Sequence, residues 1–210
     1  MATIPKGEEM RRKLIEIAGQ IFAEEGYEAA TVRQITDRAQ VNVAAVNYYF
    51  GDKFQLYRAV LQSITGRTLE QLKQHCLEGP AEERLRNLVR CLLVISSSDT
   101  PIWAHLLMAR ELVELHDDKT EVFVEAIRPI NEIAVAIVRD LLGDQADPGA
   151  IRIAAGLMIP ICVNRIPQKR IEQKLYPGTD FSQVGMEEMV ELLYQFLLAG
   201  IRGLSVSRFP

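Results

Sequence analysis

The stretch that most constrains the fold is TVRQITDRAQVNVAAVNYYFGDK, residues 31–53. Thr31 is a good helix N-cap, and the apolar residues after it recur at helical spacing, which predicts a short helix that ends at Ala39. After a short break, Asn42 can cap a second short helix, Val43–Phe50. Two short helices joined by a three-residue turn form a helix-turn-helix, in which the second helix can enter the major groove of DNA.

Longer amphipathic segments flank this pair on both sides. Apolar residues recur every three or four positions over residues 8–25, which predicts a helix that Gly26 ends. In the second short helix, Val46 and Phe50 lie four residues apart and are predicted to point inward together. The Gly-Asp pair that follows should stop this helix and cap a long one that begins at Lys53. The predicted inward face of the long helix consists of Phe54, Tyr57, Val60, Leu61 and Ile64.

The second half of the chain also has helical periodicity. The predicted helices cover residues 81–95, 102–115, 120–142, 150–165 and 185–204, with Thr120 as a cap, Gly143 as a stop and a long loop over 167–183. Pro160 should remove one backbone hydrogen bond and kink its helix. The last helix carries an apolar stripe too wide for a single buried neighbour. The predicted fold class is therefore all-α.

Charge is distributed unevenly along the chain. The formal net charge of −4 argues against a generally basic coat for nucleic acid. Residues 1–60 carry eight Lys and Arg against eight Asp and Glu, so the remainder holds the whole negative surplus. The first 60 residues are thus the better candidate for meeting a polyanion. The N-terminus lacks an apolar signal core and no apolar run is long enough to span a bilayer, so we expect a cytoplasmic protein without membrane contacts.

Cysteine and histidine patterns do not indicate a metal or cofactor site. Cys76, Cys91 and Cys162 are odd in number and far apart, so they suggest neither a disulfide framework nor a metal motif. We expect all three to be small buried hydrophobic residues. The histidines are scattered and are predicted to be exposed or hydrogen-bonded rather than ligands; they are His75, His105 and His116.

The outward residues of the helix-turn-helix suit DNA contacts. Ala44 and Ala45 would allow close approach to base edges, and Asn47 could hydrogen-bond an adenine. Tyr48, Tyr49 and Lys53 would lie at one groove wall, with Thr31 and Arg33 at the other. The predicted DNA-contacting set is Thr31, Arg33, Asn42, Val43, Ala44, Ala45, Asn47, Tyr48, Tyr49 and Lys53. The alternative is a helical hairpin in a bundle, with the tyrosines as half-buried packing.

Residues 8–60 closely resemble the N-terminal DNA-binding domain of the TetR family of bacterial transcriptional regulators. The resemblance rests on the first-helix phenylalanine, G-Y-x-x-x-T, the alanine before the turn and a Tyr-Phe-x-x-Lys ending. One departure is Gln40, where the family usually has glycine; a left-handed residue there would cost roughly 1 kcal/mol, or the turn would change shape. Many members have tyrosine at the position of Asn47, so a base preference does not carry over.

The resemblance implies a three-helix DNA-binding domain at residues 1–55 and a larger helical domain at 56–210 that binds a small molecule and pairs two subunits. The segments PIWAHLLMARELVEL and VFVEAIRPINEIAVAIV, within residues 80–200, also resemble the C-terminal domain of the CecR-type branch. In this family the last two long helices form the dimer interface, which here predicts pairing through residues 150–165 and 185–204. The apolar width of those helices supports this independently. The alternative is that both are central helices of a thick bundle.

Polar or adaptable residues on apolar helices are candidates for the effector pocket, namely Trp103, Met108, Arg110, Glu111, Arg128, Met158 and Asn164. Arg110 could equally form a structural ion pair with Glu111 or Glu114, and Trp103 and Met108 could be core residues.

The function we expect is a homodimeric repressor that binds a palindromic operator and is released by a small-molecule effector. The alternative is a structural or adaptor DNA-binding protein that has no ligand. No nucleophile elbow, phosphate loop or dinucleotide fingerprint is present, so the sequence does not favour an enzyme.

Overall fold

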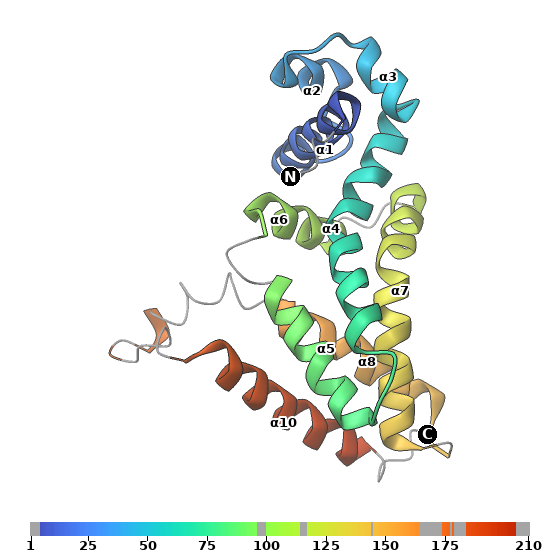
Figure 1. The fold of residues 1–210 in the computed structure, drawn as a ribbon, viewed down its shortest axis with the longest axis vertical. Helices are drawn as coiled ribbons and strands as arrows, with labels where there is room; N and C mark the ends of the chain where they lie inside the picture. Colours follow the sequence, from blue (N-terminus) through green and yellow to red (C-terminus); the bar gives the residue numbers. More distant parts are fainter. Residues whose placement is uncertain are drawn as a thin grey trace. The chain divides into compact units, whose positions relative to one another are not determined.

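The computed structural model of the chain describes residues 5–95, 100–113, 117–143, 145–163, 174–176, 178 and 184–204. The regular structure over these ranges is helical, as the periodicity predicts. The helices are α1 (Lys6–Glu25), α2 (Val32–Ala39), α3 (Ala44–Phe50), α4 (Lys53–His75), α5 (Ala81–Ile95), α6 (Ile102–Val113), α7 (Asp117–Leu142), α8 (Pro148–Val163) and α10 (Met186–Leu204) (Figure 1).

The helices group into two compact units. One unit contains residues 1–67 and 100–127, and the other contains 68–99 and 128–210. Both α4 and α7 therefore run from one unit into the other. The boundary predicted at residue 55 separates a DNA-binding from a ligand-binding domain, and it stays a prediction. The division by packing is different, because it groups α6 and the start of α7 with the N-terminal helices.

The first unit is built on an aromatic and aliphatic core. Phe22 of α1 and Tyr57 of α4 are fully buried, and their rings meet edge to face at 5.4 Å. Gly26 has φ 85° and ends α1 by donating its amide hydrogen to the Phe22 carbonyl, as predicted. Asp52 caps α4, since its carboxylate accepts from the Gln55 amide at 2.7 Å. The predicted local signals thus operate at the C-terminal end of α1 and at the N-terminal end of α4.

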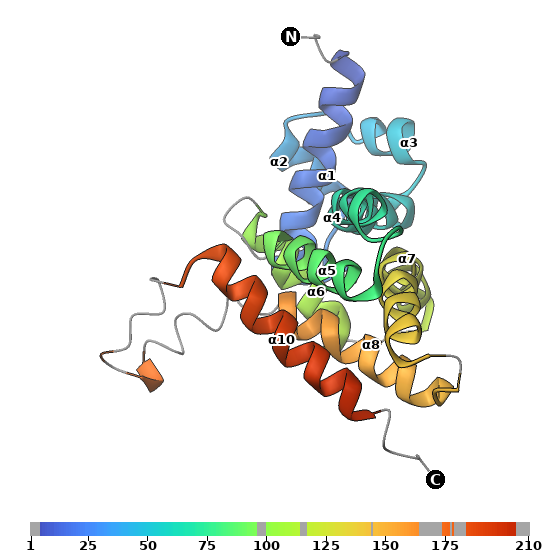
Figure 2. The ribbon, with the colours of Figure 1, turned by 60° about the horizontal axis from the view of Figure 1, so that its bottom comes forward.

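The second unit packs α5, α8 and α10 around another core. Figure 2 shows α10 beside α5 and α8, which are its neighbours in the contact pattern. Leu88 and Leu92 of α5, Ala155 of α8 and Tyr194 of α10 are buried in one cluster. The opposite sides of α8 and α10 remain exposed and apolar, with Ile153, Leu157, Leu192 and Phe196 the largest such residues.

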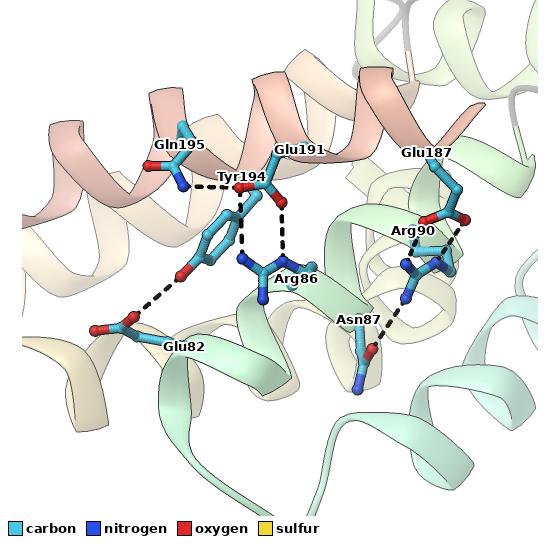
Figure 3. A network of polar contacts seen from close by, with 8 residues as sticks. All are labelled: Glu82, Arg86, Asn87, Arg90, Glu187, Glu191, Tyr194 and Gln195. Carbon is cyan, nitrogen blue, oxygen red and sulfur yellow. Dashed lines mark hydrogen bonds and ion pairs between the residues drawn. The ribbon is translucent and has the colours of Figure 1, made fainter. Parts of the chain in front are cut away.

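Ion pairs join α5 to α10 outside this core (Figure 3). Arg86 meets Glu191 at 3.1 Å and Arg90 meets Glu187 at 2.6 Å. Tyr194 donates its hydroxyl hydrogen to Glu82 at 3.1 Å, and the Arg86 guanidinium lies 4.0 Å from the Tyr194 ring centre. Exposed ion pairs contribute little individually. Together they line the side of α10 that faces α5, beside the apolar contact between the two helices.

Several predicted details need correction or lie beyond the described ranges. Thr120 is not a cap, because α7 begins at Asp117 and continues through it. Pro160 lies inside α8 and Pro129 inside α7, and the kink expected at Pro160 stays a prediction. Most of the loop predicted over 167–183 falls outside the described residues. No helix in the described part of the chain combines the length and apolar character needed to cross a membrane.

Candidate nucleic-acid interface

The bracing helix α2 begins with a complete capping box. The Thr31 hydroxyl accepts from the Gln34 amide at 3.2 Å, and the Gln34 side chain accepts from the Thr31 amide at 2.8 Å. Thr31 also donates its hydroxyl hydrogen to Gln34 at 2.7 Å. Because the hydroxyl is already engaged, an anion at this helix start would meet backbone amides first.

The turn after α2 keeps the left-handed geometry despite having no glycine. Gln40 has φ 58° and ψ 45°, and among the described non-glycine residues it is the one with positive φ. Its amide donates to the Asp37 carbonyl, and the Val41 amide donates to the Thr36 carbonyl at 3.0 Å. This is a Schellman motif, which satisfies the last carbonyls of α2. The turn is therefore not reshaped at Gln40.

The second helix of the motif, α3, is held by few residues. The Asn42 carboxamide accepts from the Ala44 amide at 2.9 Å, and Val43 already has helical φ and ψ, so Asn42 caps the helix as predicted. Val46 is fully buried and Phe50 packs against the same core. The sequence-predicted inward face is confirmed.

The outward face of α3 is not uniform. Val43, Ala44, Asn47 and Tyr48 are exposed, whereas Ala45 is half-buried against the core. The expectation that both alanines face outward therefore holds for Ala44 more than for Ala45. A small residue at the exposed position allows the closest approach of this helix to another surface.

The two tyrosines differ in their surroundings. Tyr48 is 82% exposed, and its ring meets Tyr49 edge to face at 4.9 Å. Tyr49 is half-buried and packs against the unit's core, with its hydroxyl near Gly7 of α1. Tyr48 is thus the freer of the two to contact a partner, and Tyr49 also joins α3 to α1.

Lys53 has partners inside the protein. Its ammonium donates to the carbonyls of Tyr27 and Ala30 at 2.9 and 3.0 Å, and it lies 4.2 Å from the Tyr27 ring centre. Two of its three N–H groups are therefore committed. Lys53 fastens the start of α4 to the loop after α1, a role that sequence reasoning did not predict for it.

Arg33 is the available cation on α2. Its side chain is 85% exposed and lies 3.8 Å from Asp37, a loose pair across one helical turn. Arg38 instead pairs with Glu24 of α1 at 3.1 Å. Of the two arginines on this helix, Arg33 is therefore the more exposed and the more weakly paired.

The predicted effector-pocket residues are dispersed. Trp103, Met108, Arg110 and Glu111 lie on α6, where Trp103 and Met108 pack against the first unit's core. Met158 is buried in the second unit's core and Arg128 is exposed on α7. Asn164 lies outside the described residues, as does Glu114. The described residues do not gather this set around one cavity, so the pocket stays a prediction.

The α6 residues contact α1 instead. The Trp103 ring lies over Gly19, where an added Cβ would fall 2.3 Å from the ring. The Arg110 guanidinium approaches the Ala23 and Glu24 carbonyls at 3.4 and 3.5 Å. Sequence reasoning missed this junction, although an isolated glycine inside α1 was an available signal of close approach.

Buried polar atoms at this junction are poorly matched. Glu111 is buried and its carboxylate faces Tyr57. Burial, together with this carboxylate, raises the pKa of the Tyr57 phenol. The two groups nevertheless form no well-shaped hydrogen bond. Trp103 Nε1 and His105 Nε2 are also buried without a partner among the described residues. His105 is thus neither exposed nor fully hydrogen-bonded, contrary to expectation. Desolvation lowers its pKa.

Comparison with known proteins agrees with this architecture. Residues 14–60 match the model of bacterial regulatory proteins of the tetR family, and residues 81–201 match the C-terminal domain of the HTH-type transcriptional dual regulator CecR. The chain is 42% identical over 74 residues to CecR of Shigella flexneri, covering 35% of this chain and 33% of that protein. It is 34% identical over 77 residues to the HTH-type transcriptional repressor AcnR of Corynebacterium efficiens, covering 37% and 41%. These matches span well under half of each relative's length.

A solved structure shares the fold across nearly the whole chain. It is the transcriptional regulator FadR of Bacillus subtilis in complex with stearoyl-CoA, with a TM-score of 0.66 and 16% identity over 90% of this chain and 98% of that one.

A short turn holding an exposed reading helix, followed by a larger helical part, defines the class of helix-turn-helix transcriptional regulators. The two matched models together cover most of the sequence, the second alone more than half of it. The chain belongs to the TetR family of bacterial regulatory proteins.

Proposed function

We propose that the protein represses transcription by binding a palindromic operator as a homodimer, and that a small molecule releases it. The observation that carries DNA binding is the exposed edge of α3, where Ala44, Asn47 and Tyr48 face outward while Val46 fixes the helix from behind. Direct base contacts would come from Ala44 and Asn47. Arg33 and the amides at the start of α2 would hold phosphates.

Dimerisation is supported by the uncovered apolar faces of α8 and α10. Ile153 and Leu157 on α8, and Leu192 and Phe196 on α10, are large hydrophobic residues left exposed in one chain. Such faces mark interaction surfaces. A twofold pair of reading helices in successive major grooves would then read a palindrome.

Release by an effector is supported by the packing of α6 on α1. This helix belongs to the same compact unit as the helix-turn-helix, so a shift of α6 would act on α1 directly. The Tyr57 hydroxyl and Trp103 Nε1 are buried without a hydrogen-bond partner among the described residues, which adds to the free-energy cost of the present packing of α6. A ligand that binds better to a state with α6 displaced would favour that state.

We propose that the protein represses, rather than activates, transcription. AcnR is named a repressor and CecR a dual regulator, and a dimer seated on a promoter excludes polymerase most simply by occupying its site.

The test is Ala44→Glu against Ala44→Gln on an operator selected from bound genomic fragments. The two side chains have nearly equal size, and an acidic residue in the first turn of α3 favours the helix, so folding should be kept. We expect the carboxylate to lower affinity about tenfold or more relative to the amide at fixed salt, through repulsion by phosphates. Equal affinities of the two variants, measured by fluorescence anisotropy, would remove α3 as the reading helix.

A further inference from the structure

The start of α7 lies against the loop that joins α1 to α2, residues 26–31. Phe123 of α7 is buried in the same core as Phe22 and Tyr57. Lys119 lies one helical turn before Phe123, so its side chain leaves the same side of α7. Lys119 is only 6% exposed, which is rare for a lysine unless its charge is paired. Its ammonium therefore needs a partner at the edge of this core.

This ammonium contacts two residues of the loop. Lys119 Nζ lies 3.2 Å from Glu28 Oε1 and 5.4 Å from the centre of the Tyr27 ring. The Glu28 side chain is 76% exposed, so the carboxylate is at the surface while the ammonium is buried. A carboxylate attracts a cation by its charge, and an aromatic ring attracts it through its quadrupole. Lys119 thus joins α7 to two consecutive side chains of the loop.

A second ammonium holds the same loop from α4. Lys53 Nζ lies 4.2 Å from the Tyr27 ring centre and donates to the carbonyls of Tyr27 and Ala30. Lys53 therefore fixes the backbone of the loop, whereas Lys119 holds side chains of the loop. The loop ends at Thr31, the N-cap of α2. The position of the start of α2 thus depends on α7 as well as on α4.

The pair of Lys119 and Glu28 is better suited to fixing a geometry than to adding stability. Taking an ammonium out of water costs free energy that offsets its attraction to a carboxylate, and an apolar side chain of similar volume often serves the fold as well. Glu28 is mostly in water, so it gains little from the pair. An apolar residue at position 119 would lose the directed contact with the loop.

We propose that Lys119 is a positioning residue for DNA binding, which sets the loop before α2 through Glu28 and Tyr27 and thereby places the end of α2 that would hold phosphates. This inference rests on the proposed DNA-binding function. Lys119 does not itself contact DNA, because it is buried and its ammonium faces the loop. It also lies outside residues 14–60, which match the model of the tetR family.

The preference for the operator over a scrambled sequence of the same length separates positioning from charge. In a specific complex, phosphate and base contacts must be made in one register, whereas non-specific binding depends on the phosphates alone. A change in net charge shifts both affinities together. Misplacement of α2 should lower the affinity for the operator more, and so reduce the ratio of the two affinities.

The test measures both affinities of the full-length protein by fluorescence anisotropy, at fixed salt and at a temperature where circular dichroism shows native helicity. Lys119→Met should reduce the ratio about threefold or more, with little change in the midpoint of urea unfolding. Glu28→Gln should also reduce the ratio, although loss of a negative charge by itself favours DNA binding. The double variant should lose no more than Lys119→Met alone, because both changes act through one contact. Glu16→Gln makes the same charge change at an exposed position of α1 and should keep the wild-type ratio.

The outcomes separate this inference from the proposed function. If Lys119→Met does not fold, Glu28→Gln decides, because it changes an exposed side chain only. The inference alone is overturned if the wild type prefers the operator and both folded variants keep that preference, or if neither variant folds, since the pair then supports the fold itself. If Glu16→Gln lowers the ratio as much as Glu28→Gln, charge explains the effect and Lys119 has no positioning role. A wild type without any preference for the operator overturns the proposed function and this inference with it.

Discussion

Gln40 occupies a backbone conformation that favours glycine, at the turn that sets the angle between α2 and α3. A φ of 58° costs a non-glycine residue roughly 1–2 kcal/mol. Glycine at this position would avoid that cost, but part of the gain in stability would be offset by the greater conformational entropy of glycine in the unfolded chain. We expect Gln40→Gly to raise the free energy of unfolding by about 0.5–1 kcal/mol in urea titrations. Gln40→Ala keeps the steric cost and should raise it by less. An equal rise in the free energy of unfolding for both variants would show that loss of the glutamine side chain, and not relief of the left-handed backbone, causes the stabilisation.

Lys53 and Arg33 test whether a cation near α3 supports the fold or makes the proposed contact with DNA. Lys53→Met removes a charged donor from two carbonyls and should lower the free energy of unfolding by about 1–3 kcal/mol. Arg33→Ala should change stability by less than about 0.5 kcal/mol, because its ion pair is exposed. The effects on DNA binding should be reversed. The slope of log affinity against log salt concentration should fall by about 1 for Arg33→Ala and change little for Lys53→Met. A fall of the same size for Lys53 would restore it as a phosphate contact.

At the scale of elements, the contact between α1 and α6 depends on a missing side chain. An added Cβ at Gly19 would lie 2.3 Å from the Trp103 ring, so Gly19→Ala must displace α6 or the ring and should destabilise the fold by about 1–3 kcal/mol. In a Trp103→Leu background the clash is gone, and alanine inside a helix is favoured by about 1 kcal/mol. The sign of the Gly19→Ala effect should therefore reverse in thermal denaturation. The same sign in both backgrounds would contradict the proposed contact.

What the sequence could predict follows from the range of each interaction. Caps, stops and inward faces depend on neighbours within about a turn, so the signals at Gly26, Asn42, Asp52 and Val46 were readable in advance. The partners of Lys53 lie 23 and 26 residues away, and neither charge nor spacing identifies them. The same limit applies to the residues predicted to line an effector pocket, whose helices contribute to different cores. Thr120 failed because a capable cap residue also fits inside a helix.

At the scale of the whole molecule, the exposed leucines offer a matched test of dimerisation. Leu192 on α10 and Leu112 on α6 are each 57% exposed in the single chain, so an aspartate at either position costs the monomer similarly little. If α10 pairs with its counterpart, only Leu192→Asp places a charge in a desolvated apolar contact. We expect Leu192→Asp to weaken the dimer at least about tenfold in light-scattering titrations. Operator affinity should fall with it, since in the proposed complex each monomer reads one half-site. Leu112→Asp should remain dimeric. If both variants stay dimeric, the α10 face is not the interface. If both dissociate, the interface is not confined to α8 and α10, and the proposed pairing through these two helices alone is wrong.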